Sequence, residues 1–198
     1  MGVATAQGRP YYLFTRWLRG LNIKFDVLKP DEIPNYTGDV ILTTREEFPS
    51  KSDKILLYDD EMKHGSTITL VLLLQRCGIT GDDLIVGIDP GRRIGLSVFY
   101  GSVEIDRQLF ISIERMSSHI RHIFKYIKST RHLIRIGDGD MTTAWRICRM
   151  LDVIDTPYSL EFVNESGTSP RTRHCNSRGK QDMLAARAIA QRDPWVMA

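Results

Sequence analysis

An apolar segment that ends in a single carboxylate lies near the middle of the chain. Residues 84–88 are apolar apart from Gly87, Asp89 follows them, and a Pro90-Gly91 corner leads into a second apolar run over residues 94–100. Apolar runs of this length, bounded by turn residues, predict two buried strands joined by a tight link. Because a buried strand rarely holds an unpaired carboxylate, Asp89 is predicted to close a core strand where a negative charge is needed.

The segments after this hairpin alternate between helix and strand. A helix is expected over residues 117–128, where Ile120, Ile123, Phe124 and Ile127 form one apolar stripe. The full predicted order is three strands, helix, strand, helix, strand, helix. The ranges are strands 84–88, 94–100 and 103–111, helix 117–128, strand 132–136, helix 142–151 with Thr142 or Asp140 as its cap, strand 158–163, a polar loop 166–179 and helix 180–191.

The first part of the chain predicts a separate small α/β domain with a parallel sheet. The patterns indicate helices over 11–19 and 66–77 and strands over 23–27, 39–43 and 54–58. The polar, turn-like residues 79–83 separate the two parts. We therefore expect a first domain over residues 1–80, whose role the sequence does not indicate, and a second domain over residues 84–198.

Composition limits the class of protein. The chain has 198 residues and a net charge of only +3, so charge placement matters more than the total. Three cysteines without a CxxC pair argue against a disulfide framework or a zinc ribbon, and favour a reduced, cytoplasmic setting. The longest apolar stretch, residues 68–74, is too short to span a bilayer, and residues 1–7 lack the plan of a signal peptide.

Four short motifs carry a resemblance to a known family. They are Ile88-Asp89-Pro90-Gly91 with Gly95, Ile136-Gly137-Asp138-Gly139, Val163-Asn164-Glu165-Ser166-Gly167-Thr168-Ser169, and the run from Asp182 through Leu184-Ala185-Ala186 to Ala190. The first and last resemble motifs of the RuvC and YqgF resolvase families, and the middle two resemble those of the YqgF-like domain of the transcription accessory protein Tex. The likeness covers about residues 84–194, and residues 1–80 resemble no family.

The resemblance implies a ribonuclease H-like fold and an acidic catalytic centre. Asp89, Glu165 and Asp182 would be its catalytic residues and metal ligands, and Asp138 could face the same centre. Carboxylates at strand ends and at a helix start suit Mg²⁺ or Mn²⁺, which prefer oxygen ligands. Two such ions can activate a water and stabilise the leaving oxygen in phosphodiester hydrolysis.

Two departures from the family pattern leave catalysis open. The resolvases place a glutamate on the fourth strand, where this chain has Gly137-Asp138, and they close with paired acids where Asp182 stands alone until Asp193. Asp138 and Asp140 also flank Gly139 in a favourable turn sequence, which gives them a structural interpretation. The metal site is therefore expected to have fewer carboxylate ligands than that of an established resolvase.

Basic residues gather near the predicted acidic centre. A loop and helix start hold Arg171, Arg173, His174, Arg178 and Lys180, and Arg92 and Arg93 follow Asp89. Such residues could bind the phosphates of a nucleic acid, with an affinity that falls steeply with salt. The basic run over 115–135 is predicted to be solvated surface, His119 and His122 to be surface histidines, and Trp17, Trp145 and Trp195 to be packing residues.

Three functions remain open at this level. The first is a Mg²⁺- or Mn²⁺-dependent endonuclease acting on DNA, branched DNA such as a four-way junction included, or on RNA. The second is a non-catalytic nucleic-acid-binding module with the same fold. The third, a sugar-kinase or actin-like nucleotide-binding protein, needs two related domains that the sequence does not offer. The resemblance also allows a homodimer, because a two-fold junction has two strands to cut.

Overall fold

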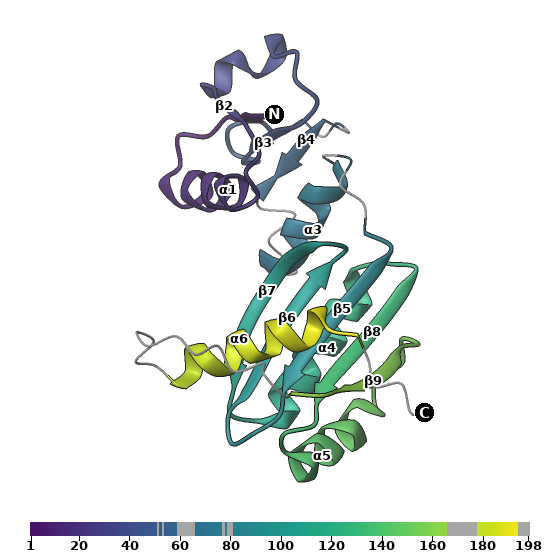
Figure 1. Ribbon diagram of the computed structural model, residues 1–198. Helices are drawn as coiled ribbons and strands as arrows, with labels where there is room; N and C mark the ends of the chain where they lie inside the picture. The colour runs from purple at the N-terminus through teal and green to yellow at the C-terminus, as the bar shows by residue number, and fades with distance from the viewer. Residues whose placement is uncertain are drawn as a thin grey trace. The chain divides into compact units, whose positions relative to one another are not determined.

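The structure is a computed structural model, shown in Figure 1, that describes residues 1–50, 52, 54–58, 66–76, 78, 81–165 and 178–193. Two compact units make up the chain, Met1–Ile79 and Thr80–Ala198. Each unit combines helices with a β-sheet of its own, so the expected α/β class is confirmed.

The first unit has a four-stranded sheet in the order β2-β1-β3-β4. Every pairing in this sheet is parallel, as the sequence predicts. Its elements are β1 (Gly2–Val3), α1 (Gly8–Gly20), β2 (Asp26–Val27), the 3₁₀ helix η1 (Pro30–Asn35), β3 (Ile41–Thr43), β4 (Ile55–Leu57) and α3 (Ser66–Arg76). The strands enclose a small apolar core around Ala4, Ile41 and Leu57.

The sequence patterns overstate one strand of this unit and miss two elements. The predicted strand 23–27 is reduced to Asp26–Val27, which lies at the edge of the sheet with both residues exposed. The strand β1 has only two residues, too few to show a period of two. The 3₁₀ helix η1 is short and contains two prolines, so its sequence shows no helical apolar stripe. Such short elements are decided by their neighbours in the sheet and core.

The second unit has a five-stranded mixed sheet in the order β7-β6-β5-β8-β9. Strands β5, β6 and β7 form an antiparallel meander, while β8 and β9 run parallel to β5. The elements are β5 (Asp83–Asp89), β6 (Ile94–Tyr100), β7 (Val103–Phe110), α4 (Ile113–Tyr126), β8 (Arg131–Gly137), α5 (Met141–Leu151), β9 (Ser159–Val163) and α6 (Arg178–Gln191). This order of elements is the predicted one.

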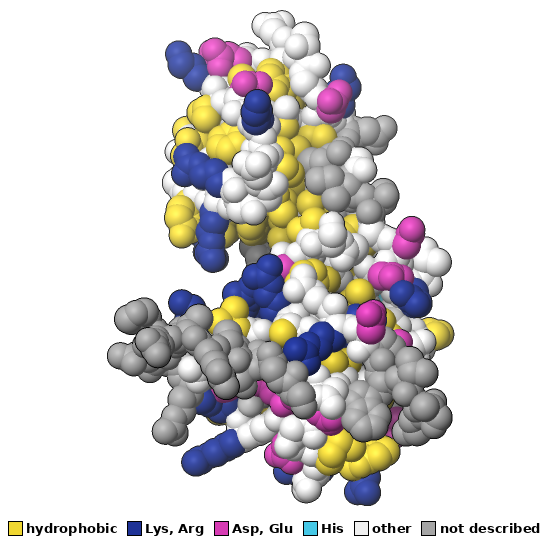
Figure 2. All heavy atoms as spheres, viewed as in Figure 1, with side chains coloured by type: hydrophobic (Ala, Val, Ile, Leu, Met, Phe, Trp, Pro, Cys, Tyr) yellow, Lys and Arg dark blue, Asp and Glu magenta, His cyan; other side chains and the backbone are white. Residues whose placement is uncertain are grey.

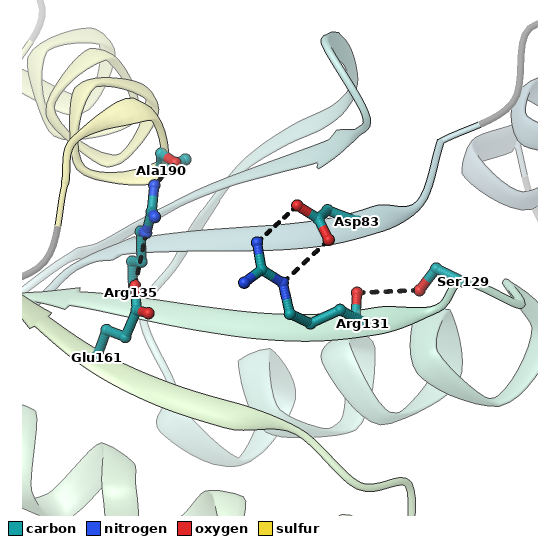
Figure 3. A network of polar contacts seen from close by, with 6 residues as sticks. All are labelled: Asp83, Ser129, Arg131, Arg135, Glu161 and Ala190. Atoms are coloured by element: carbon teal, nitrogen blue, oxygen red, sulfur yellow. Dashed lines mark hydrogen bonds and ion pairs between the residues drawn. The ribbon is translucent and has the colours of Figure 1, made fainter.

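Helix α6 crosses one face of this sheet, and α4 and α5 lie on the other face (Figures 1 and 3). Two glycines allow α6 to come close to the strands. A Cβ atom at Gly87 would lie 2.3 Å from the carbonyl oxygen of Ala186, and one at Gly95 would lie 2.1 Å from that of Asp182. Helix and sheet backbones are therefore in direct contact, which fixes the position of the start of α6.

An arginine on β8 anchors the other end of α6 (Figure 3). Arg135 pairs with Glu161 at 2.9 Å and donates to the carbonyl oxygen of Ala190 at 2.9 Å. The prediction that residues 115–135 form solvated surface is thus wrong for Arg135, whose side chain is 12% exposed. Arg131, more exposed, pairs with Asp83 on the neighbouring strand.

The start of α4 differs from the sequence prediction, and the start of α5 decides between two predicted caps. Helix α4 begins at Ile113, four residues before the predicted start, because Ser112 caps it by accepting the Arg115 N–H. Ser117, the predicted start, is instead buried and donates to the Met150 carbonyl. Asp140 caps α5 by accepting the backbone N–H and the hydroxyl of Thr143, which decides between the two expected caps.

Candidate functional site

Asp89 is the last residue of the central strand β5 and lies at the end of the sheet where α6 begins. Its partner across the antiparallel pairing with β6 is Gly95. Residues paired in this way project from the same face of a sheet. Because the backbone of Asp182 lies directly over Gly95, the start of α6 meets the end of β5 here, and two predicted site residues from distant parts of the chain come together.

Glu165 lies just beyond β9, and its side chain extends across the end of β8 toward Asp89. Ile88 of β5 pairs with Ile136 of β8, which sets Gly137 beside Asp89. A Cβ atom at Gly137 would lie 1.9 Å from Glu165 Oε1, and one at Gly139 would lie 2.2 Å from Glu165 Oε2. The carboxylate thus occupies space that any side chain at these two positions would fill.

Asp138 holds the segment that carries Glu165. Its Oδ1 accepts the backbone N–H of Glu165 at 2.9 Å, and its own N–H donates to the Val163 carbonyl at 3.1 Å. These bonds clip the end of β9 to the end of β8. The structure therefore gives Asp138 a positioning role, and its role as a metal ligand stays a prediction.

The negative charges of Glu165 and Asp182 act on the carboxyl group of Asp89. Burial, together with the negative charges of Glu165 and Asp182, raises the pKa of Asp89 to about 7. Burial also raises the pKa of Glu165, with Asp138 and Asp140 adding to the rise and a hydrogen bond from the Gly139 backbone opposing it. A site of this kind favours either a proton or a cation among its carboxylates.

An open cleft of about 810 Å³ lies beside Asp89 and Asp182. Its other lining residues are Pro90, Gly91, Arg92, Arg93 and Ile111. Arg93 Nη2 is 3.0 Å from Asp182 Oδ2, whereas Arg92 is exposed at the rim. Ile111 is 80% exposed and adds an apolar surface to a charged cleft. The cleft therefore combines acidic, basic and apolar side chains.

No three His, Cys, Asp or Glu side chains within the described ranges are gathered closely enough to hold a metal ion. Asp89 interacts with both Glu165 and Asp182, but Asp182 is also engaged by Arg93. The donors are of the right chemistry for a hard divalent cation. A cation would require these side chains to close in around it.

The predicted basic loop is described only at its end. Arg171 and Arg173 lie outside the described residues, as do the side chain of Arg178 and Cys77, Cys175 and Trp195. Lys180 is exposed in the first turn of α6. The contribution of the loop to nucleic-acid binding stays a prediction, and Arg92 and Arg93 are the basic residues seen at the cleft.

Other predicted side chains have specific partners. His119 lies 2.6 Å from Asp106 of β7, and His122 contacts the ring of Tyr126, so the two histidines serve different contacts. Trp145 was expected to be a packing residue, yet it is 55% exposed and rests against Phe162. Phe162 belongs to β9, which lies at the edge of the described sheet.

Sequence reasoning missed three features of the site. These are the close approach of the Glu165 carboxylate to Gly137 and Gly139, the hydrogen bond from the Glu165 backbone N–H to Asp138, and the ion pair between Arg93 and Asp182. The first had a signal in the sequence, since a Gly-Asp-Gly run at a strand end indicates a close approach of other groups. The ion pair joins residues 89 positions apart and had none.

One structural property bears on location: of the described helices, none combines the length and the apolar character needed to cross a membrane.

Comparisons with protein-family models and with curated proteins found no match. Among solved structures, the chain is similar to Argonaute of Marinitoga piezophila, in complex with 5′ OH guide RNA and target DNA. The TM-score is 0.35 with 10% sequence identity, and the alignment covers 83% of this chain. The chain spans 39% of the length of that Argonaute chain. A similarity at this level establishes neither a family nor a function.

Proposed function

We propose that this protein is a metal-dependent nuclease that hydrolyses nucleic-acid phosphodiesters, with a ribonuclease H-like second unit. The observation that carries the proposal is that Asp89, at the carboxyl end of the central strand, lies within electrostatic reach of Glu165 and Asp182, which come from distant segments of the chain. A carboxyl group whose pKa is raised by burial and by neighbouring negative charges destabilises the fold when it is ionised, and such groups are concentrated at functional sites. A divalent cation relieves this repulsion.

The arrangement of the second unit supports this class of fold. An antiparallel meander followed by two strands parallel to the first is the order expected of a ribonuclease H-like sheet. The motifs around Asp89, Glu165 and Asp182 resemble those of the RuvC and YqgF resolvase families. An actin-like protein would need a second related domain, whereas the sheet described in the first unit is wholly parallel.

Each residue of the site has a proposed role. Asp89, Glu165 and Asp182 would hold Mg²⁺ or Mn²⁺, which when bound activates a water and stabilises the leaving oxygen. Gly137 and Gly139 leave room for Glu165 beside Asp89, and Asp138 fixes its backbone. Arg92 and Arg93 lie where they can bind phosphates of the substrate, and Ile111 can contact a sugar or base.

A non-catalytic nucleic-acid-binding module is the second candidate. The observation that favours it is that no three candidate ligands in the described part of the chain are gathered around one point. In that function the cleft and its arginines would bind a phosphate backbone without cleavage. The two candidates differ in whether bound nucleic acid is cleaved.

A cleavage assay on a panel of substrates tests the proposal. Single-stranded DNA, duplex DNA, an RNA–DNA hybrid, duplex RNA and a four-way junction are incubated with the full chain and Mg²⁺ or Mn²⁺. We expect at least one substrate to be cut, and Asp89→Asn or EDTA to abolish cutting. Binding without cleavage supports the module instead, and cleavage that survives Asp89→Asn rules out this active site.

A further inference from the structure

Arg93 is tied to the acidic site by an ion pair within the cleft. Its Nη2 atom is 3.0 Å from Asp182 Oδ2, and both side chains line the same cleft as Asp89. The side chains of Arg93 and Asp182 are 36% and 23% exposed, so this pair is partly desolvated. Partial burial makes the contact stronger than a fully solvated surface pair, which is worth little.

The fold directs this guanidinium to the start of α6. Arg93 belongs to the short link between β5 and β6, whose first residues are Pro90 and Gly91. The Cβ position of Gly179, in the first turn of α6, is 4.0 Å from Arg93 Nη1. The guanidinium therefore lies along the first turn of α6, with Asp182 one turn further on.

A cation at the carboxylates and the Arg93 guanidinium would compete for Asp182. The carboxyl group has two oxygens, and both a divalent cation and a guanidinium bind them most strongly in their ionised form. Positive charge already paired with Asp182 also opposes the arrival of a second positive charge. A released guanidinium has a better partner in a phosphate, since its planar set of donors matches phosphate oxygens in pairs.

We propose that Arg93 is an exchangeable counter-ion of the acidic site. It pairs with Asp182 in the state described here, leaves that carboxylate when a divalent cation binds, and then holds a phosphate of the nucleic acid. The proposal rests on the proposed metal-dependent nuclease function. It adds that occupation by the metal and by the substrate are coupled through one side chain.

Two measurable consequences follow from this exchange. Removing the guanidinium should strengthen binding of the metal alone, because Asp182 is no longer engaged. The same change should weaken the effect of metal on nucleic-acid binding, because no freed arginine is available for the phosphate. Thermodynamic coupling requires that metal and nucleic acid strengthen each other's binding equally.

Mn²⁺ alone is the first probe, titrated into the full chain and followed by its electron paramagnetic resonance signal. We expect Arg93→Gln to bind Mn²⁺ at least threefold more tightly than the native chain. Arg93→Lys, which keeps the charge but not the planar donors, should bind Mn²⁺ more like the native chain. Arg92→Gln is the matched control, since it removes a neighbouring positive charge that is exposed at the rim, and its Mn²⁺ affinity should change by less than 1.5-fold.

A labelled DNA oligonucleotide, with and without Ca²⁺, is the second probe. Ca²⁺ is a hard cation that carboxylates also bind. We expect Ca²⁺ to raise DNA affinity at least tenfold in the native chain and less than threefold in Arg93→Gln. Circular dichroism confirms that each variant is folded, and Arg93→Lys provides a second test if Arg93→Gln is not.

The outcomes separate the two proposals. If neither the native chain nor Arg93→Gln binds Mn²⁺, the metal-dependent function fails and the counter-ion exchange fails with it. If both bind Mn²⁺ with equal affinity and Ca²⁺ raises DNA affinity equally, the exchange is overturned while the nuclease stands. If Arg92→Gln tightens Mn²⁺ binding as much as Arg93→Gln does, the effect is general charge and the exchange is overturned.

Discussion

Asp89 carries the clearest physical signature of a functional residue in this chain. Its carboxyl group is held with its pKa raised to about 7 by burial and by two neighbouring carboxylates. A folded-state pKa above the unfolded value means that the folded chain binds this proton more tightly. Stability is therefore lost as the pH rises from about 4, the unfolded pKa, through the folded value near 7, and is constant above it.

Asp89→Asn should accordingly stabilise the fold while abolishing cleavage. Asparagine mimics the neutral carboxyl group, so the gain in melting temperature should be small near pH 4, grow up to pH 7 and level off above it. We expect a rise of several degrees at pH 8, since about 1 kcal/mol corresponds to about 2–4 °C for a chain of this size. Thermal unfolding followed by circular dichroism at four pH values checks this. A pH-independent difference contradicts the raised pKa.

Gly137 is the second residue at which the site is decided. Gly137→Ala places a methyl group where Glu165 Oε1 now lies, 1.9 Å from the ideal Cβ position. Since the displaced atom is the end of a flexible side chain, stability should change by no more than about 1 kcal/mol. Nuclease activity should fall at least tenfold, because Glu165 is moved away from Asp89. Rate measurements and urea unfolding check the two effects separately.

Gly20→Ala is the matched control for this substitution, because no heavy atom lies within 4 Å of its Cβ position in α1. It should leave the rate unchanged and should leave stability unchanged or raise it by up to about 1 kcal/mol, because alanine favours a helix more than glycine does. Full activity of Gly137→Ala would show that the position of Glu165 does not matter for turnover.

At the level of elements, the contact of α6 with the sheet sets the geometry of the site. Gly95→Ala brings a Cβ to within 2.1 Å of the Asp182 carbonyl oxygen, a backbone atom that cannot rotate away. We expect a loss of about 1–3 kcal/mol from overpacking and a displacement of Asp182. Urea unfolding of Gly95→Ala beside Gly20→Ala measures it, and equal stability of the two variants contradicts the close approach of α6.

At the level of the whole molecule, a net charge of only +3 means that nucleic-acid binding depends on where the positive charges lie. Nucleic-acid affinity should fall with salt according to the phosphates neutralised at the cleft, with a slope of about 0.9 per contact on duplex DNA. Arg92→Gln should lower that slope by about one. Arg9→Gln, which removes an exposed charge in the first unit, should leave it unchanged. Binding measured between about 50 and 300 mM KCl, a range that brackets the physiological ionic strength of about 150 mM, gives the slopes. Equal slopes for the two variants contradict a local phosphate site.

The sequence could predict elements with strong periodicity and failed where neighbours decide. The hairpin around Asp89 and the stripe of α4 carry their own patterns, so they were expected from the chain alone. The start of α4 was missed because Ser112 and Ser117 are equally plausible caps until one is buried. Trp145 was misjudged because exposure depends on whether another element covers the edge of the sheet.

The amino-acid sequence by itself predicted the order of the elements in the second unit and the presence of Asp89 at the end of a core strand, and its resemblance to the resolvase families implied the candidate set of Asp89, Glu165 and Asp182. The order of the elements and the place of Asp89 follow from local periodicity and turn residues, which act over a few residues, whereas the candidate set is what the resemblance of four short motifs implies. Only the tertiary structure decided that Glu165 lies over Gly137 and Gly139, that Asp138 clips two strand ends together and that Arg93 engages Asp182. These contacts join segments separated by 26 to 89 positions, and their formation depends on sheet register and helix placement, which no local pattern encodes.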